Sequence, residues 1–593
     1  MSSPVAERPR TAADLLQFAD LADVDQFIDG LRKFESGEWT PDQFKVYRLN
    51  RGAYGQRQTD VNMLRIKLPA GVASAAQLEA LGDVAEKYSR GFGHVTTRQN
   101  LQLHFCQLDR MPDLMRDLAE AGLTTKEACG NTVRNVTGCP MAGACAGEAF
   151  DVTPVAHAIA REFVRRPEFQ SLPRKFKIAL SGCSDDCAMG AINDVGLIAT
   201  VVDGVRGFRM KVAGGLSTTP NGAHLLHEFL PIDRVLGAIE AVIRTFDAHG
   251  NRQNRMRARL KYVVRKHGEA GFRLLYDNAL AEVRAAGREL QPIDLADGES
   301  LSRSRTLPLA PTGDHAALGA GAGEPLARFR ASNVRAQKQR GFVAVTVRLV
   351  RGDATSAQFR GLADLARRFG DGMARFTIDQ NLLLRFVPEA RIAELHAGLA
   401  AIGLAEAGAG TIVDVTSCPG AETCNLAVTG SRELASAVTA RLGEDDALTL
   451  AASAAGLSVK VSGCPNSCGQ HHVAAIGFHG GMRRVGGRVI PEYTLHLGGG
   501  IDATGATFGR TVIKVPARRA PAALVKLLEL YEAKKAPGED ALTFFRRIPD
   551  DAVKAAVAAL VKIDEATAPA EDFFDLGDTR EFEVKTGVGE CAV

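Results

Sequence analysis

The amino-acid sequence predicts an α+β protein made of two copies of one folding unit, related by a pseudo-two-fold axis. Three observations support this: residues 96–105 (TTRQNLQLHF) reappear as 377–386 (TIDQNLLLRF), similar helical patterns surround both segments, and each half carries four cysteines at matching spacing. Gln99 and Gln380 are 281 residues apart, and equivalent cysteines follow at 279 and 281. A single copy at this spacing indicates a domain duplication, because solenoid repeats are only about 20–50 residues long.

In each copy the repeated segment predicts a strand between two amphipathic helices. The first copy has helical patterns at 75–88 and 111–123, and the second has them at 356–369 and 391–404. With a strand ahead of the first helix, the predicted order is strand, helix, strand, helix. A longer α/β unit follows, in which a strand leads into each cysteine pair.

Breaks in these patterns mark the predicted domain boundaries. Residues 289–330 are rich in Gly, Pro, Ala and Ser without a clear period, which predicts a linker between the halves. The last residues, 585–593 (KTGVGECAV), predict a mobile tail. The predicted parts are an N-terminal helical extension (1–45), a first half-domain (46–125), a first larger domain (126–288), the linker (289–330), a second half-domain (331–405), a second larger domain (406–550), and a C-terminal helix and tail (551–593).

Composition narrows the class of protein. The chain has 593 residues, of which 46% are hydrophobic and 24% charged, and its net charge of +3 gives no argument for a nucleic-acid partner or a membrane surface. It has no apolar run of about 18 residues, and residues 1–20 lack the apolar core of a signal peptide. A cytoplasmic protein is therefore expected, and its eleven cysteines point to metal or redox chemistry rather than to disulfides.

Eight of the cysteines form two sets of four with identical spacing. In the second half, Cys418 and Cys424 enclose five residues, and Cys464 and Cys468 enclose three. Four thiolates on two turns can hold a [4Fe–4S] cluster or a zinc ion, and buried reduced thiols need no metal at all. The five-residue gap favours the bulkier cluster, because zinc prefers closer pairs. The first-half set consists of Cys139, Cys145, Cys183 and Cys187.

Two interpretations of the first-half set remain open. One is a second iron–sulfur cluster. The other is a relic set of reduced thiols, or thiols that hold adventitious metal. The preserved spacing of all four cysteines favours real ligands.

The second-half set resembles the cluster signature of the nitrite/sulfite reductase haemoprotein family, in TSCPGAETC (416–424) followed by SGCPNSCGQHHVAAIGF (462–478). The resemblance runs from about Tyr47 to Gly509 and includes the duplication and the blocks MLRIKLPAG, TTRQN, VRNV and LPRKFK. It implies a duplicated sirohaem reductase fold, with ferredoxin-like half-domains and two larger α/β domains for sirohaem and cluster. The implied cluster ligands are Cys418, Cys424, Cys464 and Cys468, of which Cys468 also binds the sirohaem iron.

Two groups of polar residues in the first half match positions that line the active site in this family. The resemblance implies that the bound oxyanion is surrounded by Arg65, Arg134, Lys175 and Lys177. It also implies that the sirohaem is bordered by Arg98, Asn100, Gln102 and His104, which alternate and so predict one side of a strand. The less specific interpretations are a solvated strand face and four unrelated surface bases. A buried anion, however, requires paired cations.

The second half lacks these bases. At the offsets of the three arginines it has Thr346, Asp379 and Val413, and near the two lysine positions it has Gly456 and Ser458. The sequence therefore predicts a single sirohaem, whose carboxylates Asp379 would repel, and an active site between the halves.

The resemblance implies a six-electron reduction, of sulfite to sulfide or, alternatively, of nitrite to ammonium. Sulfite-type members resemble this chain in having lysine at both Lys175 and Lys177, whereas plant-type nitrite reductases have asparagine at the second position. Sulfite is a dianion at neutral pH and nitrite a monoanion, so the second lysine favours sulfite.

No phosphate-binding glycine loop follows a strand as a nicotinamide or flavin domain requires, so electrons must come from an external donor. Ferredoxin is the implied donor, with a separate flavoprotein reductase as the alternative. Two non-enzymatic interpretations are an iron–sulfur electron carrier with a decayed haem site and a zinc-structured binding protein. Cys129 is either part of the substrate pocket or a buried apolar residue, and Cys591 is a candidate redox thiol in the tail.

Overall fold

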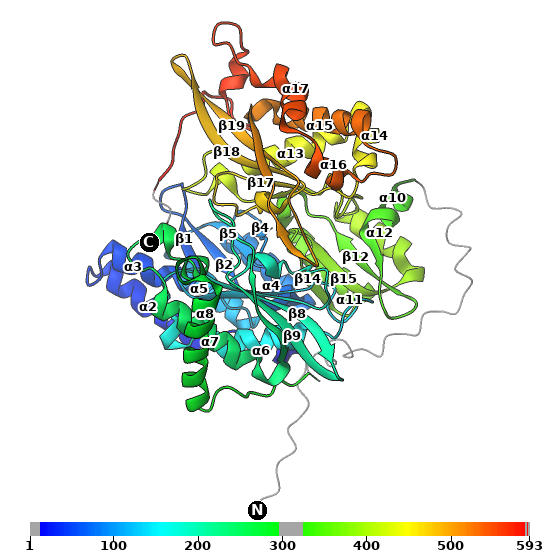
Figure 1. Cartoon of the computed structure of the whole chain (residues 1–593). Helices are drawn as coiled ribbons and strands as arrows, with labels where there is room; N and C mark the ends of the chain where they lie inside the picture. The colour runs from blue at the N-terminus through cyan, green and yellow to red at the C-terminus, as the bar shows by residue number, and fades with distance from the viewer. Residues whose placement is uncertain (1–11, 296–323, 588–589, 591–593) are drawn as a thin grey trace, which may run out of the picture.

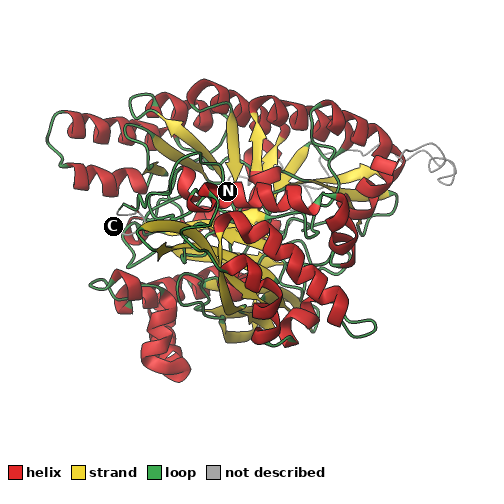
Figure 2. Cartoon of the chain, turned by 90° about the horizontal axis from the view of Figure 1, so that it is seen from above, coloured by secondary structure: helices red, strands yellow, loops and turns green. Residues whose placement is uncertain are grey.

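A computed structural model describes residues 12–295, 324–587 and 590 of the chain (Figure 1). Its strands form four five-stranded sheets and one two-stranded ribbon. Two of the larger sheets belong to half-domains, and the other two belong to the cysteine-bearing domains. Figure 2 shows helices over the outside of the molecule, with the strands between them. No described helix is long and apolar enough to cross a membrane.

Three helices precede the first sheet. The Asp20 side chain caps α2 by accepting a hydrogen bond from the Ala22 amide (2.9 Å), and Thr40 and Gln43 form a capping box at the start of α3. The buried rings of Phe27 and Phe44 attach these helices to the core of the half-domains. The three helices are α1 (Ala12–Leu15), α2 (Leu21–Glu35) and α3 (Pro41–Leu49).

The two half-domains have the same fold. Each sheet packs helices on one face. The equivalent helices that begin at Ala75 and Ser356 each start at a capping box, Ser74 with Gln77 in one and Thr355 with Gln358 in the other. The first half-domain contains β1 (Ala53–Gly55), β2 (Asn62–Ile66), α4 (Ala75–Tyr88), β4 (Phe92–Val95), β5 (Leu101–Cys106) and α5 (Met111–Glu120). The second contains α10 (Glu324–Asn333), β11 (Val334–Ala336), β12 (Phe342–Val347), α11 (Ser356–Phe369), β14 (Met373–Phe376), β15 (Leu382–Pro388) and α12 (Ile392–Ala401).

Each half-domain completes its sheet with a strand from the other half. β3 (Val72–Ser74) leaves the first half-domain and pairs with β14, whereas β13 (Asp353–Thr355) leaves the second and pairs with β4. Gly71 and Gly352 precede these strands with positive φ angles of 70° and 73°. A Cβ atom at Gly71 would lie 2.3 Å from a backbone oxygen of the other half, so the crossing admits only glycine there.

The two larger domains also share one topology, in which three parallel strands are followed by two antiparallel ones. The first domain contains β6 (Val133–Gly138), α6 (Thr153–Phe163), β7 (Phe176–Ser181), β8 (Val195–Val202), β9 (Val205–Val212), β10 (His224–Pro231), α7 (Val235–His249) and α8 (Leu260–Ala285). The second contains β16 (Thr416–Ser417), α13 (Ser431–Leu442), α14 (Asp445–Ser453), β17 (Val459–Ser462), β18 (Ile476–Val485), β19 (Arg488–Leu497), β20 (Gly500–Asp502), β21 (Gly505–Thr507), β22 (Arg510–Pro516), α15 (Ala520–Lys534), α16 (Ala541–Arg547) and α17 (Asp550–Val561). The predicted duplicated α+β fold is confirmed.

The predicted linker and the predicted C-terminal tail differ in part from what the sequence suggested. Most of the predicted linker, residues 296–323, lies outside the described residues, and its last residues belong to α10, which begins at Glu324. Two described residues of the predicted mobile tail contact distant parts of the chain. The Gly587 amide donates to the Asn425 carbonyl (2.9 Å), and the Glu590 carboxylate pairs with Arg48. The reason is that the tail's single glutamate pairs with Arg48, a half-buried cation far away in the sequence. Cys591 lies outside the described residues.

Candidate active site and cysteine sites

The second-half cysteines are gathered by two neighbouring parallel strands. Cys418 directly follows β16 and Cys464 nearly follows β17. Because the carboxyl ends of parallel strands meet at one edge of a sheet, the two cysteine turns come together there. Cys418 and Cys464 are buried, Cys424 is half-buried and Cys468 is exposed. Burial and the other three thiols raise the pKa of Cys464, which indicates that all four sulfurs share one site.

The spacing of these sulfurs does not match a single tetrahedral ion. Zinc bonds of about 2.3 Å would hold ligand sulfurs about 3.8 Å apart. Among the described residues, the group of potential metal ligands whose atoms all lie within 4.8 Å of one another consists of three histidines. No three sulfurs of either cysteine set lie that close together. A [4Fe–4S] core separates its thiolates more widely, so the geometry favours a cluster over zinc.

The first half-domain holds the loop that carries this set. The Arg57 amide donates to the Thr423 carbonyl (3.0 Å), and the Arg57 guanidinium donates to the carbonyls of Cys424 (3.2 Å) and Ala427 (2.6 Å). Gln58 donates to the Glu422 carbonyl (2.7 Å). The cysteine loop of one half is therefore fixed by the half-domain of the other.

Cys468 lies where the two halves meet. The Thr97 hydroxyl, from the turn between β4 and β5, donates to the Cys468 carbonyl (3.0 Å). Lys177, from β7 of the first half, is close enough to Cys468 for the thiolate to favour its protonated form. The structure thus brings a predicted anion-binding base and the predicted bridging thiol together across the boundary.

The four predicted anion-binding bases also converge. Arg65 and Arg134 both donate to the Ala128 carbonyl, at 3.4 and 3.2 Å. Arg134 and Lys175 line one pocket, and Lys175 is near enough to Lys177 to lower its pKa. Burial is the largest cause of that lowering, with contributions from other nearby cations. The bases come from strands β2, β6 and β7 and the segment before β7, which explains their wide separation in the sequence.

The C-terminal segment reaches the same pocket. Glu590 lines it beside Arg134 and Lys175, and its carboxylate accepts a hydrogen bond from the Gly55 amide (2.7 Å). Sequence reasoning missed this contact, because nothing in the tail marks a partner some 540 residues away.

The predicted strand of cofactor-binding residues needs a correction. Arg98 and Asn100 lie in the turn before β5, and only Gln102 and His104 lie on the strand itself. The reason is Gln99, whose φ of 55° is left-handed and interrupts the extended backbone. Expecting one continuous strand face was therefore wrong.

The Arg98 guanidinium joins this turn to the first larger domain. It donates to Thr137 Oγ1 (3.0 Å), Asn193 Oδ1 (2.9 Å) and two backbone carbonyls. Burial lowers the pKa of Arg98 to about 9, so it remains a cation at neutral pH. Arg98 thus fixes the turn and contributes positive charge.

Polar atoms near this turn are left without partners. Asn100 Oδ1, both ring nitrogens of His104 and Arg98 Nε are buried and make no hydrogen bond to any described residue. Buried polar atoms in folded proteins almost always have a partner. Together with the converging cations, they fit a bound group that carries several negative charges.

The counterpart of Arg98 in the second half is neutralised. Asp379 Oδ1 accepts a hydrogen bond from Lys460 Nζ (2.9 Å), and Lys460 also donates to Gln470 Oε1 (3.1 Å). Lys460 is buried in β17. The sequence predicted an uncompensated Asp379 that repels carboxylates, whereas the structure pairs its charge.

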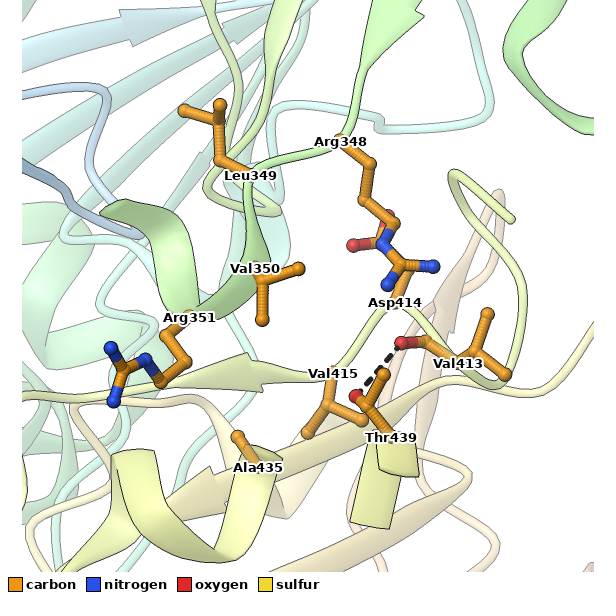
Figure 3. A pocket seen from close by; sticks show the side chains of 9 residues that line it. All are labelled: Arg348, Leu349, Val350, Arg351, Val413, Asp414, Val415, Ala435 and Thr439. Carbon is orange, nitrogen blue, oxygen red and sulfur yellow. Dashed lines mark hydrogen bonds between the residues drawn. The ribbon is translucent and has the colours of Figure 1, made fainter. Parts of the chain in front are cut away.

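A separate pocket in the second half contains no counterparts of the four anion-binding bases (Figure 3). Val413 stands at the position that an arginine occupies in the first half, and its carbonyl accepts from Thr439 Oγ1 (3.2 Å). Arg348, the cation nearest to Asp414 in this view, is bound to Glu406 (2.8 Å). Burial raises the pKa of Asp414 to about 6. The pocket is thus unsuited to a multiply charged anion.

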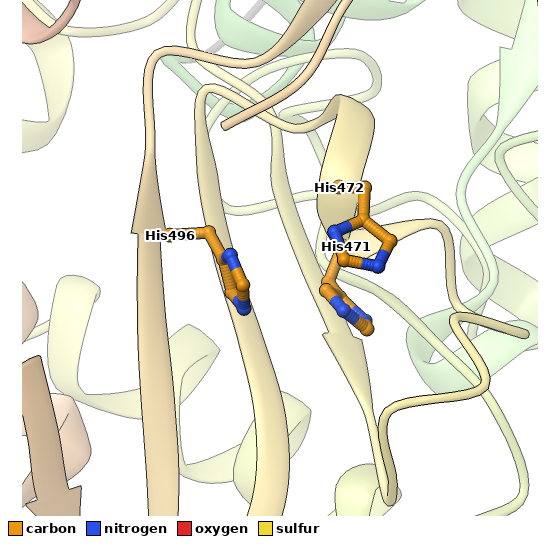
Figure 4. Close-up of side chains that lie close together, drawn as sticks. All are labelled: His471, His472 and His496. Atoms are coloured by element: carbon orange, nitrogen blue, oxygen red, sulfur yellow. The ribbon is translucent and has the colours of Figure 1, made fainter. Parts of the chain in front are cut away.

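A histidine nest, His471, His472, His479 and His496, lies beside the second cysteine set and was missed at the level of sequence. His471, His472 and His496 have ligand atoms within 4.8 Å of one another (Figure 4). His479 Nδ1 lies 2.7 Å from His496 Nε2. The signal was present in GQHH (469–472) and HLGGG (496–500), but the two segments meet only when β18 and β19 pair.

The nest should make stability depend on pH. Burial lowers the pKa of His496 to about 3 and of His479 to about 4, with further lowering by neighbouring histidines and, at His479, by Lys514. The unfolded chain takes up these protons below about pH 6.5, whereas the folded chain does not. Stability is therefore complete above that pH and falls as the pH drops.

Between about pH 7.5 and pH 5 the wild-type protein should lose free energy of unfolding, and His496→Gln should make this loss smaller by about 2 kcal/mol. Urea unfolding at the two pH values measures the difference. His249→Gln, at an exposed position, is the matched control and should keep the wild-type slope. Equal slopes for His496→Gln and wild type would show that the nest is not the source of the dependence.

Comparisons with known proteins agree with this architecture. A family model described as "Nitrite and sulphite reductase 4Fe-4S domain" matches residues 129–283 and 408–541, and "Nitrite/Sulfite reductase ferredoxin-like half domain" matches 54–121 and 335–402. Sulfite reductase [ferredoxin] 1 of Mycolicibacterium paratuberculosis is 32% identical over 76% of this chain and 75% of its own length.

Two further proteins extend the comparison. The assimilatory ferredoxin-dependent nitrite reductase of Haloferax mediterranei is 30% identical over 87% of this chain and 86% of its own. The solved structure of the NirA protein of Mycobacterium tuberculosis superposes with a TM-score of 0.75 at 27% identity, covering 92% of this chain and 98% of that chain.

Proposed function

Because the chain belongs to the nitrite and sulphite reductase family, we propose that it reduces sulfite to sulfide with six electrons delivered by a ferredoxin. Membership makes it an oxidoreductase with an iron–sulfur cluster. The choice of substrate, the sirohaem and the roles of individual residues are the proposal. The observation that carries it is that Arg65, Arg134, Lys175 and Lys177 are neighbours, and that Lys177 lies near Cys468.

The cofactor ligands follow from the second-half site. Cys418, Cys424 and Cys464 would hold the cluster, and the exposed Cys468 would hold both the cluster and the sirohaem iron. A sirohaem coupled to the cluster would supply the electrons for the reduction, and the residues of this chain would bind the anion beside it. Asn100, His104 and Arg98 offer unpartnered polar atoms that fit a sirohaem with its ring of carboxylates.

The four bases would bind the substrate, and Lys177 would also supply protons to it. Arg65 and Arg134 present forked donors, already oriented by the Ala128 carbonyl, that suit two oxygens of one anion. Lys175 and Lys177 add compact charges. The lowered pKa of Lys177 means that it releases its proton more readily than an ordinary lysine, which suits a group that must donate a proton when a substrate oxygen leaves as water.

Sulfite is favoured over nitrite by the charge of this cage. Four cations around one anion match a dianion better than a monoanion, and the second lysine, Lys177, is the feature that distinguishes the two. Nitrite is the second candidate substrate, and it is supported by relatives named as nitrite reductases. A decayed electron carrier is disfavoured, since electron transfer alone needs no anion cage.

The donor and the compartment are also inferred. Relatives are named as ferredoxin-dependent enzymes, and the described residues contain no dinucleotide-binding loop, so a ferredoxin is the expected partner, with a flavoprotein reductase as the alternative. The ten described cysteines form no disulfide, which fits a reducing compartment and hence the cytoplasm.

An absorption spectrum of the purified protein, followed by titration with sulfite and nitrite under a reductant, tests the proposal. A Soret band with a red-shifted chlorin band, perturbed by both anions, and faster turnover of sulfite are expected. Faster turnover of nitrite would reverse the substrate assignment. An iron–sulfur shoulder without chlorin bands would leave the electron carrier instead.

A further inference from the structure

The first-half cysteines are placed by the same backbone as the second-half set. The Cys139 amide donates to the Leu180 carbonyl (3.0 Å), as the Cys418 amide does to Val461 (3.3 Å). Two further backbone hydrogen bonds occur at equivalent positions of both loops. In the first loop the Cys145 amide donates to Met141 and the Ala149 amide donates to Gly182. In the second loop the Cys424 amide donates to Gly420 and the Val428 amide donates to Gly463. The first loop has therefore kept the conformation of a cluster-binding loop.

The thiols themselves repeat the pattern of exposure. Cys139 and Cys183 are buried, Cys145 is half-buried and Cys187 is exposed, in the same order as in the second set. Cys187 and Cys145 both act on the pKa of Cys183, and Cys139 and Cys183 both act on the pKa of Cys187, so the four thiols are near neighbours. No three of these sulfurs lie within 4.8 Å of one another, so this site is also wider than a zinc site.

The opposite half-domain holds this loop as well. The Lys338 amide donates to the Ala144 carbonyl (2.8 Å), and Gln339 donates to the Gly143 carbonyl (2.8 Å). Arg385 donates to the Ala142 carbonyl. A relic loop would be free to lose these contacts, yet they mirror those that Arg57 and Gln58 make to the second loop.

A buried cation faces the set without enough partners. Arg375 is 1% exposed, and its Nε and Nη2 make no hydrogen bond to any described residue. Its one hydrogen bond to a described residue is from Nη1 to Thr153 Oγ1 (3.1 Å), and the charges of Asp151, Asp371 and the Cys139 thiolate act on it. A buried cation with unpaired donors is costly. A cluster held by four thiolates is an anion and would add negative charge beside these donors.

A second sirohaem is excluded from this site by apolar packing. Ala179, Ala188 and Ile378 form a buried cluster with Met189 beside Cys187. The equivalent positions beside the second cysteine set are polar or glycine: Lys460, Gly469 and Gln470 from the second half and Thr97 from the first. The cysteines remain, but the space beside them is filled.

We propose that Cys139, Cys145, Cys183 and Cys187 bind a second [4Fe–4S] cluster. This inference deepens the proposed function by adding a second metal centre, but it does not depend on the substrate or on the presence of sirohaem. It assigns Arg375 as the cation that compensates the charge of this cluster.

The test is metal and sulfide analysis of the full-length protein, purified and reconstituted without oxygen. Wild type should contain about eight non-haem irons and about eight acid-labile sulfides per chain. Cys183→Ser should lower both to about four while the chlorin bands remain. Cys106→Ala, which changes a buried cysteine outside both sets, should keep about eight.

About four irons in wild type, unchanged in Cys183→Ser, would overturn the proposal, as would a single zinc ion that is lost with Cys183→Ser. If Cys183→Ser does not fold, the wild-type count and the electron paramagnetic resonance of the reduced protein decide between one cluster and two. Eight irons without chlorin bands would refute the proposed function and leave this inference standing.

Discussion

Cys464→Ser is expected to lower the turnover of both sulfite and nitrite by at least about 100-fold. Changes in residues that merely support a metal ligand cost about 10–100-fold, so loss of a ligand should cost more. Cys464 is buried at the end of β17 and shares its site with three other thiols. Removing it should empty the cluster site and cut the path of electrons to the anion.

The measurement is steady-state reduction of each anion with a chemical or ferredoxin donor, together with the iron content. Cys106→Ala is the matched control and should retain wild-type turnover, since Cys106 is buried but belongs to neither set. Near-normal turnover in a Cys464→Ser protein that has lost four irons would show that the second-half site does not serve catalysis.

Lys177→Asn is expected to change the preference between the two substrates. A hydrogen bond to a charged group contributes about 1.5–3 kcal/mol, so kcat/KM for the sulfite dianion should fall about 100-fold. Nitrite carries one charge less and should lose about 10-fold or less. The preference for sulfite would then decline by about 10-fold or more.

Parallel kinetics with both anions measure this effect. Lys211→Asn is the control, because Lys211 is a buried lysine on β9 of the same domain that was not assigned to the anion site. The ratio of the two kcat/KM values should stay at its wild-type level in that variant. An equal loss for sulfite and nitrite in Lys177→Asn would mean that Lys177 contributes charge without distinguishing the substrates.

Features that occur in both copies of the repeat could be predicted from the sequence. The offset of 281 residues between Gln99 and Gln380 revealed the duplication, and the cysteine spacing predicted both thiol clusters. The exchange of β3 and β13 could not be predicted, because each strand has only three residues and so no measurable period. The pairing of such short strands is decided by tertiary contacts rather than by local propensity.

The site was predictable only where a family pattern covered it. The four bases do converge, yet the alternation of residues 98–104 suggested a strand where Gln99 forms a left-handed turn. A period-two pattern cannot reveal a single residue with positive φ. Contacts between distant segments were missed for another reason, since Arg375, Lys460 and Glu590 acquire their partners only through the fold.

The exchanged strands have a consequence for the ancestry of the molecule. Neither half-domain has a complete five-stranded sheet by itself, because β3 and β13 are each supplied by the other half. An ancestor with one copy of the unit would meet the same need only as a symmetric dimer, in which both subunits exchange a strand and both sites are identical. Fusion into one chain removes that symmetry constraint. One site can then keep its cations, while the other has Thr346 and Val413 at the positions of Arg65 and Arg134.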